Sequence, residues 1–561
     1  MRATTNEAIR MRLANETASP VFDYVIVGSG FGGSVSAMRL AEKGYRVLVL
    51  ERGARFEDQD FPKTNWQLSK YLWMPGLGFK GIMELNLLPD ILVLHWCGVG
   101  GGSLGYANVL IEPDDLMFEN PAWRDLADWR SLLRPHYEIA KRMLGRNLVT
   151  RLTPADEVLR KVAEGFNRGS TFSPVNVGVY FGDDGVEVPD PYFDGEGPSR
   201  SGCIHCGACM IGCRHNAKNT LPKNYLYFAE KWGVEVRPMA RVQRIESVEQ
   251  DHPSGARYRV HYRRSTKFIG DGMDVLARNV IISAGVMGTL TLLFHCRDVA
   301  RTLPGISPKL GENVRTNSEA LLGVTDVDPE SNHTKGVAIA SVFEPIDGTH
   351  VEPFRFPDGS SFLIRLLGAP LTDGGERGFL KKLALMAAEI ARKPLSFLAS
   401  KLSPSWSRKT FGVLVMQAED NKMRVGYGRH IRLLFNRGLI TSRDVAKPVP
   451  TEIPIGHEVV RRMASEVKGE PVGNVAEGLL NMPITAHILG GCPIGHNDQS
   501  GVVGMDFQVH GYPGLFVIDG SIVPANPGLN PSLTITAIAE FAMSQIPPKS
   551  DEAYRGRLGE V

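Results

Sequence analysis

The sequence has few cysteines and no long apolar run. Seven of its 561 residues are cysteine, and four of these lie between positions 203 and 213. A segment of about 18 consecutive apolar residues, which a membrane-spanning helix requires, does not occur. With so few cysteines outside one cluster, we expect reduced thiols that act as ligands or as buried apolar groups, and no disulfide framework.

The sequence also lacks an excess of positive or negative charge. The 63 Lys and Arg residues nearly balance the 61 Asp and Glu residues, which gives a formal net charge of +2 without long blocks of like charge. We therefore expect no nucleic-acid partner. Residues 1–20 contain neither an apolar signal-peptide core nor a twin-arginine pair, which predicts a cytoplasmic location.

A dinucleotide-binding motif stands near the beginning of the chain. A buried strand is expected over residues 22–27, followed by Gly28, Gly30 and Gly33 in a Gly-x-Gly-x-x-Gly turn, then a helix and a second strand that ends at Glu51. Gly28 permits the tight turn, Gly30 lets the backbone approach a pyrophosphate, and Gly33 allows the helix to pack on the strand. Glu51 is placed to accept hydrogen bonds from an adenosine ribose.

A second glycine-rich segment indicates a cofactor larger than NAD. An NAD site needs one such fingerprint, whereas residues 97–113 add three successive glycines before Ser103. Two further expected strands end at Gly285 and at Asp519. Together these features point to FAD.

The set and order of these motifs resemble those of the glucose-methanol-choline (GMC) flavoprotein oxidoreductases. The matching segments are GSGFGG (28–33), GVGGGSL (98–104), SAGVMGTLTLL (283–293), HILGGCPIG (487–495) and GLNPSLTITAIAE (528–540). Within this family the chain resembles the bacterial GMC-type cholesterol oxidases, through GGGSL-x-YAN, AKNTL and AH-x-LGG.

The resemblance implies an α/β fold, with a Rossmann-like FAD-binding domain of GMC type and an α+β substrate-binding domain on a mostly antiparallel sheet. We expect the FAD-binding domain to be discontinuous, over 20–310 and 480–548, with insertions at 61–90 and 125–200. Residues 311–479 then form the substrate-binding domain. The length of the chain agrees with two joined domains.

The resemblance also implies which residues lie along FAD. They are Gly28, Gly30, Phe31, Gly32, Gly33, Glu51, Gly101, Ser103, Asn108, Val242, Asp519, Gly520, Asn530 and Pro531. Val242 would contact adenine through its backbone, although a valine in a strand is more often part of the core. Tyr106 and Val109 stand where other members have an asparagine and a methionine beside the flavin, and Asn108 can compensate through a shifted register.

Three residues match the family's chemistry. His487 matches the family's catalytic base. An imidazole suits this role because it titrates near neutral pH and can accept a hydroxyl proton. Without the resemblance, a core histidine with its hydrogen bonds made is the simpler interpretation. Asn530 matches the residue that orients the hydroxyl, but before Pro531 it can also cap a helix. Glu352 matches the glutamate with which cholesterol oxidases shift a steroid double bond, although most glutamates are solvated.

These matches predict FAD-dependent oxidation of a secondary hydroxyl on a bulky apolar alcohol, namely a 3β-hydroxysterol, with isomerisation of its double bond as an additional step. His487 would take the proton while hydride passes to flavin N5, and oxygen would be the acceptor. One alternative is a GMC dehydrogenase that passes electrons through an iron–sulfur cluster to an external acceptor. Another class is a GMC lyase or photodecarboxylase, which a base matched to a hydroxyl opposes. The oligomeric state is not predicted.

The cysteine cluster distinguishes an oxidase from a dehydrogenase, because a bound iron–sulfur cluster would favour the dehydrogenase. Cys203, Cys206, Cys209 and Cys213 follow the C-x2-C-x2-C-x3-C spacing of bacterial ferredoxins. This spacing suits a [3Fe–4S] or [4Fe–4S] cluster better than structural zinc, which draws on two separated pairs. However, Arg214 replaces the ferredoxin proline, and the chain has no second cysteine run. Some GMC dehydrogenases hold a cluster at this place, while other members carry similar segments without known metal.

Residues 377–402 are expected to form a basic amphipathic helix. Phe379, Leu383, Met386 and Ile390 share one face, and Lys381, Lys382, Arg392 and Lys393 lie elsewhere. Such a helix either packs on its own domain or lies on a membrane surface. The second option predicts peripheral contact with the inner face of a membrane.

Overall fold

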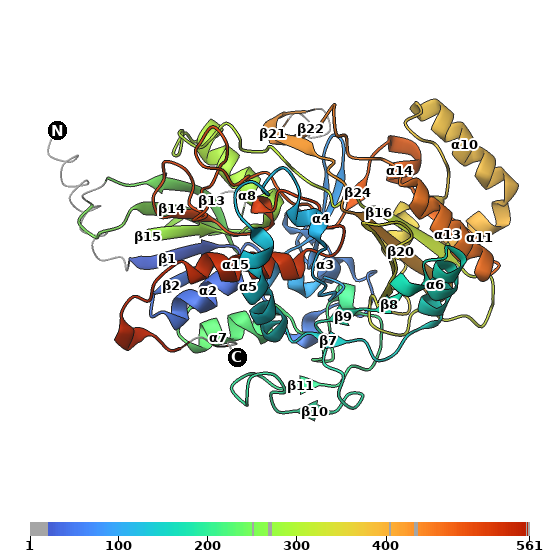
Figure 1. Ribbon diagram of the computed structural model, residues 1–561, viewed down its shortest axis with the longest axis horizontal. Coiled ribbons are helices and arrows are strands. Elements are labelled where there is room, and N and C mark those ends of the chain that lie inside the picture. The colour runs from blue at the N-terminus through green and yellow to red at the C-terminus, as the bar shows by residue number, and fades with distance from the viewer. Residues whose placement is uncertain are drawn as a thin grey trace.

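The computed structural model describes residues 21–249, 252–267, 272–402, 406–430, 436–556 and 558. Residues 1–20, from which the cytoplasmic location was predicted, lie outside the described part of the chain. Two large sheets and their flanking helices dominate the described chain (Figure 1). The cores of the two sheets lie at opposite ends of the long axis of the molecule, so the region between them can be lined by both.

A seven-stranded sheet carries the dinucleotide-binding motif. Its order is β12-β2-β1-β15-β14-β13, with β25 beside the C-terminal half of β15. The strands are β1 (Phe22–Val27), β2 (Val47–Leu50), β12 (Glu235–Arg237), β13 (Ala240–Ser247), β14 (Tyr258–Arg264), β15 (Met273–Ile282) and β25 (Leu515–Val517). β12, β2, β1, β15 and β25 run parallel, and β13 and β14 add an antiparallel extension. This parallel core confirms the Rossmann-like fold.

The parallel strands form because their sequences are almost continuously apolar. β1 reads FDYVIV and β2 reads VLVL, and every residue in both is buried, as expected for a strand covered on both faces. Four helices pack together over these strands: α2 (Phe31–Glu42), α5 (Trp129–Met143), α7 (Tyr225–Lys231) and α15 (Ser532–Ser544). Arg39 of α2 is buried and pairs with Glu540 of α15 at 2.8 Å, so the first and last long helices are joined by charge as well as by packing.

The second large sheet, called the second sheet below, has five strands in the order β18-β20-β16-β23-β19. Its strands are β16 (Ala320–Thr325), β18 (Thr349–Phe354), β19 (Gly368–Pro370), β20 (Thr410–Gln417) and β23 (Glu470–Asn474). Every pairing in it is antiparallel, which confirms the mostly antiparallel sheet expected from the resemblance. Helices α6 (Pro154–Gly165) and α13 (Pro454–Glu466) cover one face of this sheet.

Side chains along β18 alternate between the two faces of the second sheet, and the two faces have different surroundings. Val351 points into the apolar core beneath α6 and α13. His350 and Glu352, on either side of it, therefore face the opposite side of the sheet, where their neighbours on β20 are Met416 and Leu414. This opposite face is the one turned toward the dinucleotide-binding sheet.

The 61–90 segment and the chain after residue 480 meet in a small three-stranded sheet, with the order β24-β6-β5. Its strands are β5 (Met83–Leu87), β6 (Leu92–Trp96) and β24 (Ile484–Thr485). The other strands are β3 (Trp73–Met74), β4 (Phe79–Lys80), β7 (Asn147–Leu148), β8 (Ser173–Pro174), β9 (Asn176–Val177), β10 (Glu187–Val188), β11 (Arg200–Ser201), β17 (Ser341–Val342), β21 (Met423–Arg429) and β22 (Arg437–Arg443). The other helices are α3 (Leu68–Tyr71), α4 (Asp115–Phe118), α8 (Gly285–Phe294), α9 (Phe362–Leu367), α10 (Phe379–Arg392), α11 (Pro394–Leu402), α12 (Trp406–Lys409) and α14 (Val475–Leu480).

Helix α10 has a different orientation from the one its sequence pattern suggested. Lys382 is buried, where its ammonium pairs with Glu452 at 3.2 Å, and Met386 is buried beside it. Phe379 and Leu383, expected on the same face as Met386, are exposed instead. Because the Lys382 ammonium pairs with Glu452 inside the protein, Lys382 and Met386 form the buried side of α10, and Phe379 and Leu383 are turned toward solvent. No helix in the described ranges is both long enough and apolar enough to cross a bilayer.

Candidate active site

A cavity of about 720 Å³ lies between the two large sheets and is lined by both. Gly28, Gly30 and Glu51 line it on the side of the dinucleotide-binding sheet, and His487 and Asn530 line it where the second sheet approaches. The second sheet and its neighbours add mainly apolar side chains, among them Leu321, Ile339, Phe354, Phe356, Leu363, Leu367 and Leu414. A polar cradle is therefore continuous with an apolar chamber.

The glycine turn fits a bound pyrophosphate. Gly28 has φ +97°, and a Cβ there would lie 2.3 Å from the Ser283 carbonyl oxygen. A Cβ on Gly33 would lie 2.1 Å from the Gly28 carbonyl oxygen. Gly30, by contrast, has open space beside it and precedes the first residue of α2, so the free N–H groups of this helix end are available to an anion. The roles expected for these three glycines agree with their surroundings.

Glu51 lies at the end of β2 with its carboxylate buried under the glycine turn. Its Oε2 accepts hydrogen bonds from the backbone N–H of Ser29 at 3.0 Å and from the Ser29 hydroxyl at 2.8 Å, and Oε1 accepts from the N–H of Gly53 at 2.7 Å. An ionised carboxylate offers about four acceptor positions. Glu51 can therefore hold the turn and still accept hydrogen bonds from ribose hydroxyls.

Most of the other residues expected along FAD border the cavity. Those that do are Phe31, Gly32, Gly101, Val242, Asp519, Gly520 and Pro531. Gly33, which packs against the glycine turn, does not, and neither do Ser103 and Asn108. The Ser103 hydroxyl donates to the Gly100 carbonyl at 2.7 Å and accepts from the N–H of Leu221 at 3.0 Å, so it fixes the loop from inside. Asn108, fully buried with φ +72°, lies beside the Cys209 thiol, and its neighbours Ala107 and Val109 line the cavity instead.

His487 is held by a residue that the sequence did not indicate. Its Nδ1 lies 3.0 Å from Oε2 of Glu319, which is buried at the start of β16. Glu319 also accepts from the Thr485 hydroxyl at 2.9 Å and from the N–H of Ala486 at 3.1 Å. Because a carboxylate only accepts hydrogen bonds, Nδ1 carries the proton and Nε2 is left as an acceptor at the cavity.

The charges around His487 and Glu352 are coupled. Burial lowers the pKa of His487, but the carboxylates of Glu319 and Glu352 outweigh it, and the net pKa lies above the ordinary value. Burial raises the pKa of Glu352 to about 7, against the opposing influence of His350, His487 and Asn530. Glu352 therefore changes protonation close to neutral pH, and the two carboxylates favour the protonated form of His487 once it has accepted a proton.

Asn530 connects the cavity to Glu352. Helix α15 begins two residues later, and no side chain caps it, so the helix-cap alternative does not describe Asn530. With its amide nitrogen turned toward Glu352, Asn530 donates to Oε1 at 2.9 Å. Glu352 itself is fully buried behind Asn530 and does not line the cavity. The structure thus brings Glu352 together with His487 and Asn530, which lie more than a hundred residues further along the chain.

The four clustered cysteines line a second, smaller cavity. All four are free thiols, and burial raises the pKa of Cys206 to about 11. Tetrahedral zinc would bring its sulfur ligands to about 3.8 Å from one another. Among the described residues, no three of these sulfur atoms lie within 4.8 Å of one another, so the arrangement does not favour a single zinc ion. Met210, between Cys209 and Cys213, also lines the large cavity.

Lys218 lies behind the cysteine loop and was not expected to take part in the site. It is fully buried, and its ammonium donates to the carbonyl oxygens of Leu104 at 3.1 Å, Tyr106 at 2.9 Å and Cys209 at 2.8 Å. Burial lowers the pKa of Lys218 to about 7, although nearby Cys209 and Cys213 act in the opposite direction and raise it. Lys218 therefore ties the cysteine loop to the loop that follows the three glycines.

These features define a flavoprotein class, in which a dinucleotide-binding sheet and an antiparallel sheet share one cavity. Residues 26–56 match the NAD(P)-binding Rossmann-like domain, and residues 438–539 match the GMC oxidoreductase family. The chain belongs to the GMC oxidoreductases, and it is an FAD-dependent alcohol oxidoreductase.

Relatives of known name support this membership. A cholesterol oxidase of Mycobacterium tuberculosis (strain ATCC 25618 / H37Rv) is 43% identical over 554 residues, which cover 96% of this chain and 94% of that protein. A cholesterol oxidase of Acinetobacter baumannii is 39% identical over 548 residues, covering 96% and 97%. The crystal structure of pyridoxine 4-oxidase from Mesorbium loti, with 15% identity and a TM-score of 0.57, covers 93% of this chain and 99% of that one, and it shows the same fold.

Proposed function

We propose that this enzyme oxidises the secondary hydroxyl of a bulky apolar alcohol and that the substrate is a 3β-hydroxysterol. The observation that carries the proposal is the His487–Glu319 pair, which places an imidazole acceptor at an apolar cavity continuous with the glycine turn. An apolar chamber of this kind matches a rigid hydrocarbon better than a small polar alcohol. Similarity to proteins named cholesterol oxidase supports the sterol assignment.

The chain's own residues would handle the proton. FAD, when bound, supplies the acceptor for the hydride that leaves the carbinol carbon. Nε2 of His487 takes the hydroxyl proton, and the Glu319 carboxylate stabilises the positive imidazole through its hydrogen bond to Nδ1. Asn530, at the cavity wall, orients the hydroxyl oxygen. The glycine turn, Glu51 and the backbone around Asp519 would hold the cofactor.

Glu352 is suited to move a proton across the steroid ring after oxidation. Its pKa of about 7 lets the carboxyl group accept a proton and return it without leaving either form strongly favoured. Because Glu352 does not line the cavity, transfer from a steroid carbon requires the Asn530 side chain to turn aside. Asn530 stands between Glu352 and the cavity, and its amide can change its hydrogen bond with the protonation state of the carboxyl. Isomerisation of the double bond is therefore part of the proposal.

Anaerobic reduction with a matched set of alcohols tests the substrate assignment. A 3β-hydroxysterol should bleach the flavin absorbance within a turnover time, and its 3α epimer and a linear primary alcohol should bleach it far more slowly. The epimer is the matched control, because it has the same apolar body and differs only at the reacting carbon. Equal bleaching by all three compounds, or none with the sterol, contradicts the proposal.

The cysteine loop supports a second proposal, that an iron–sulfur cluster receives the electrons. The Lys218 ammonium donates to three backbone carbonyls and lies 4.7 Å from the centre of the Tyr106 ring, and none of these partners carries a negative charge. A buried cation without an anion is costly, and a cluster held by thiolates would supply the missing negative charge. The contact of Met210 with the large cavity would place such a cluster near the flavin.

Iron and sulfide analysis of anaerobically purified protein, together with electron paramagnetic resonance, tests the cluster. We expect about three or four irons per chain and a cluster signal that disappears in Cys209→Ser, whereas Cys492→Ser, a buried cysteine outside the loop, should retain it. Iron at background level would contradict the cluster and leave oxygen as the direct acceptor.

Helices α10 and α11 support peripheral membrane contact. Leucines on this pair are strongly exposed, with Leu380 at 78% and Leu395 at 80%, and Lys381 and Lys393 are exposed near them. The pair stands at the outer end of the second sheet (Figure 1). Exposed apolar and basic side chains on neighbouring helices fit the surface of an anionic bilayer, from which a sterol would be drawn.

A further inference from the structure

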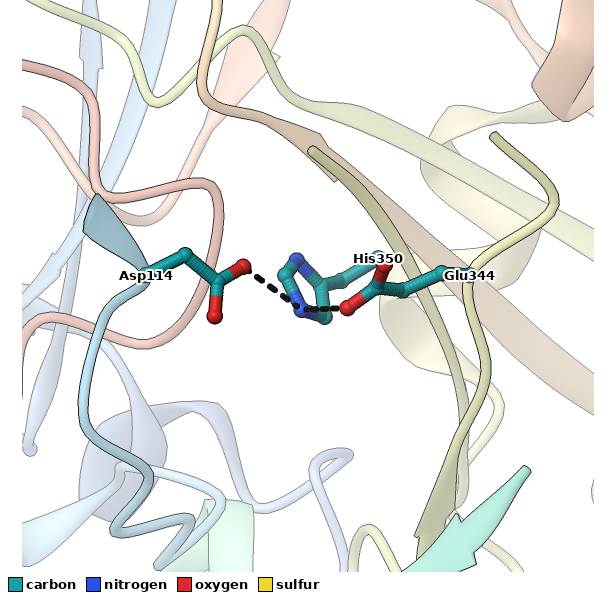
Figure 2. A group of neighbouring side chains, drawn as sticks. All are labelled: Asp114, Glu344 and His350. Atoms are coloured by element: carbon teal, nitrogen blue, oxygen red, sulfur yellow. Dashed lines mark ion pairs between the residues drawn. The ribbon is translucent and has the colours of Figure 1, made fainter. Parts of the chain in front are cut away.

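Asp114, Glu344 and His350 meet at the edge of the second sheet, away from the large cavity (Figure 2). Nε2 of His350 lies 3.0 Å from Oε1 of Glu344 and 3.9 Å from Oδ2 of Asp114. The imidazole is buried, whereas Glu344 is partly exposed and Asp114 is exposed. The two carboxylates approach the ring from different segments, Asp114 from the residue before α4 and Glu344 from the loop between β17 and β18. One edge of the imidazole therefore faces groups that exchange protons with water.

His350 is also a neighbour of the active-site residue Glu352 along β18. His350 and Glu352 are two residues apart on β18, so their side chains leave the same face of the strand about 6.7 Å apart. Nδ1 of His350 is buried and has no hydrogen-bond partner within the described chain. A buried nitrogen without a partner is costly unless water satisfies it, and water held between Nδ1 and Glu352 would connect the two groups.

A bound cation explains the cluster less well than a proton does. Arg168 extends toward Glu344, with its guanidinium 3.8 Å from Oε2, and it also pairs with Asp347 at 2.6 Å. A guanidinium at this position repels a metal ion from the same carboxylate. The 3.0 Å contact between Nε2 and Glu344 is instead an ordinary charge-assisted hydrogen bond.

We propose that His350 is a proton-relay residue, which carries the proton released by alcohol oxidation from Glu352 to Glu344 and Asp114 at the surface. The proposal rests on the proposed function, because the N–H bond formed at Nε2 of His487 must break as an O–H bond forms on Glu352 before the relay can begin. The O–H bond of Glu352 breaks as an N–H bond forms at Nδ1. The N–H bond at Nε2 then breaks as an O–H bond forms on Glu344 or Asp114, and water removes the proton. Nothing is oxidised or reduced in these transfers.

The charges around His350 agree with this route. Burial lowers the pKa of His350, but Glu344, Asp114 and Glu352 outweigh it, so the net pKa lies above the ordinary value. The positive imidazole in turn opposes the rise in the pKa of Glu352. The charge on each group therefore acts on the other, as a relay between them requires.

Infrared titration of the resting protein tests the coupling without turnover. The carboxyl band of Glu352 is assigned by its loss in Glu352→Gln. His350→Gln should raise the pKa of Glu352 above about 7 by roughly one pH unit, because a neighbouring positive charge is removed. The surface double variant Asp114→Asn/Glu344→Gln should shift it in the same direction. His457→Gln is the matched control, since His457 is also buried between two carboxylates but lies outside the cavity wall. An unchanged Glu352 titration in the surface variant contradicts the relay even if His350→Gln folds poorly.

A single anaerobic turnover with a pH-indicator dye tests the transfer itself. In the unmodified enzyme, proton release should follow flavin bleaching with the same rate constant. In His350→Gln, bleaching should continue while proton release falls behind it by roughly tenfold or more. Release that still keeps pace with bleaching contradicts the relay. Absence of bleaching by the sterol in the unmodified enzyme would instead contradict the proposed function, so the two failures are distinguishable.

Discussion

A single hydrogen bond, between Nδ1 of His487 and Glu319, determines what the imidazole can do. It fixes the tautomer that leaves Nε2 as an acceptor, and its negative partner raises the pKa of the ring against the effect of burial. His487 and Asn530 could be predicted from the sequence, because each lies in a recognisable motif. Glu319 could not, since it stands in an ordinary segment 168 residues from its partner and only the fold brings the two together.

Replacing Glu319 with Gln should slow anaerobic flavin bleaching on the order of 10²-fold, because the neutral amide neither fixes the tautomer nor stabilises the charged ring. Stopped-flow absorbance measures the rate. Glu477→Gln is the control, since Glu477 forms the same kind of buried pair with His457, at 2.6 Å. If both variants behave alike, the pair at the cavity has no special role.

The bleaching rate should rise with pH and become level once His487 is neutral. His487 can accept a proton only when neutral, and its pKa lies above the ordinary value, so the rate is lost as pH falls through that pKa. Glu352 also loses its capacity as an acceptor as pH falls through its own pKa of about 7. A pH–rate profile from pH 5 to 9 under anaerobic conditions measures this, and a flat profile would argue against a titrating base.

At the scale of elements, the strands were more predictable than the long helix of the second domain. β1 matches the expected boundaries because a continuous apolar run bounded by a glycine turn has few alternatives. The single helix expected over 377–402 is in fact two helices, α10 and α11, which are separated at Lys393 before Pro394, and the periodicity assigned the wrong side of α10 to the core. Inside the protein, the Lys382 ammonium pairs with Glu452 and donates a hydrogen bond to the Glu477 carbonyl. Periodicity within a helix cannot predict partners that lie so far away in the sequence.

Placing charge on the exposed leucines should weaken membrane contact. The double variant Leu380→Glu/Leu395→Glu should bind anionic vesicles about tenfold or more weakly, because it loses two apolar side chains and repels the lipid headgroups. Co-sedimentation with vesicles measures binding. Leu148→Glu changes a leucine that is 54% exposed on β7, and it should bind as the unmodified protein does. Equal binding by all three proteins would contradict the assigned surface.

At the scale of the whole molecule, the site exists only where two sheets share a cavity. The motif order predicted both sheets, but not how the apolar chamber is closed. That depends on contacts such as β6 against β24, which come from segments about 400 residues apart. The boundaries proposed from the sequence, 20–310 with 480–548 and 311–479, stay a prediction.

Because the cavity would hold FAD between segments from the beginning, middle and end of the chain, cofactor loss should lower stability. Removing FAD should lower the temperature of unfolding by several degrees, and excess FAD should restore it, since a ligand at about 100 times its Kd contributes roughly 2.7 kcal/mol. Differential scanning calorimetry measures the shift. The same transition temperature with and without FAD would mean that the cofactor does not bridge the sheets.

The most direct test of the central claim is the rate at which a 3β-hydroxysterol bleaches bound flavin in His487→Gln, compared with the unmodified enzyme, by anaerobic stopped flow. The account predicts a rate lower by roughly 10² to 10⁴, with the flavin still bound and its resting spectrum unchanged. An equal rate in the two proteins would contradict the assignment of His487 as the group that takes the hydroxyl proton.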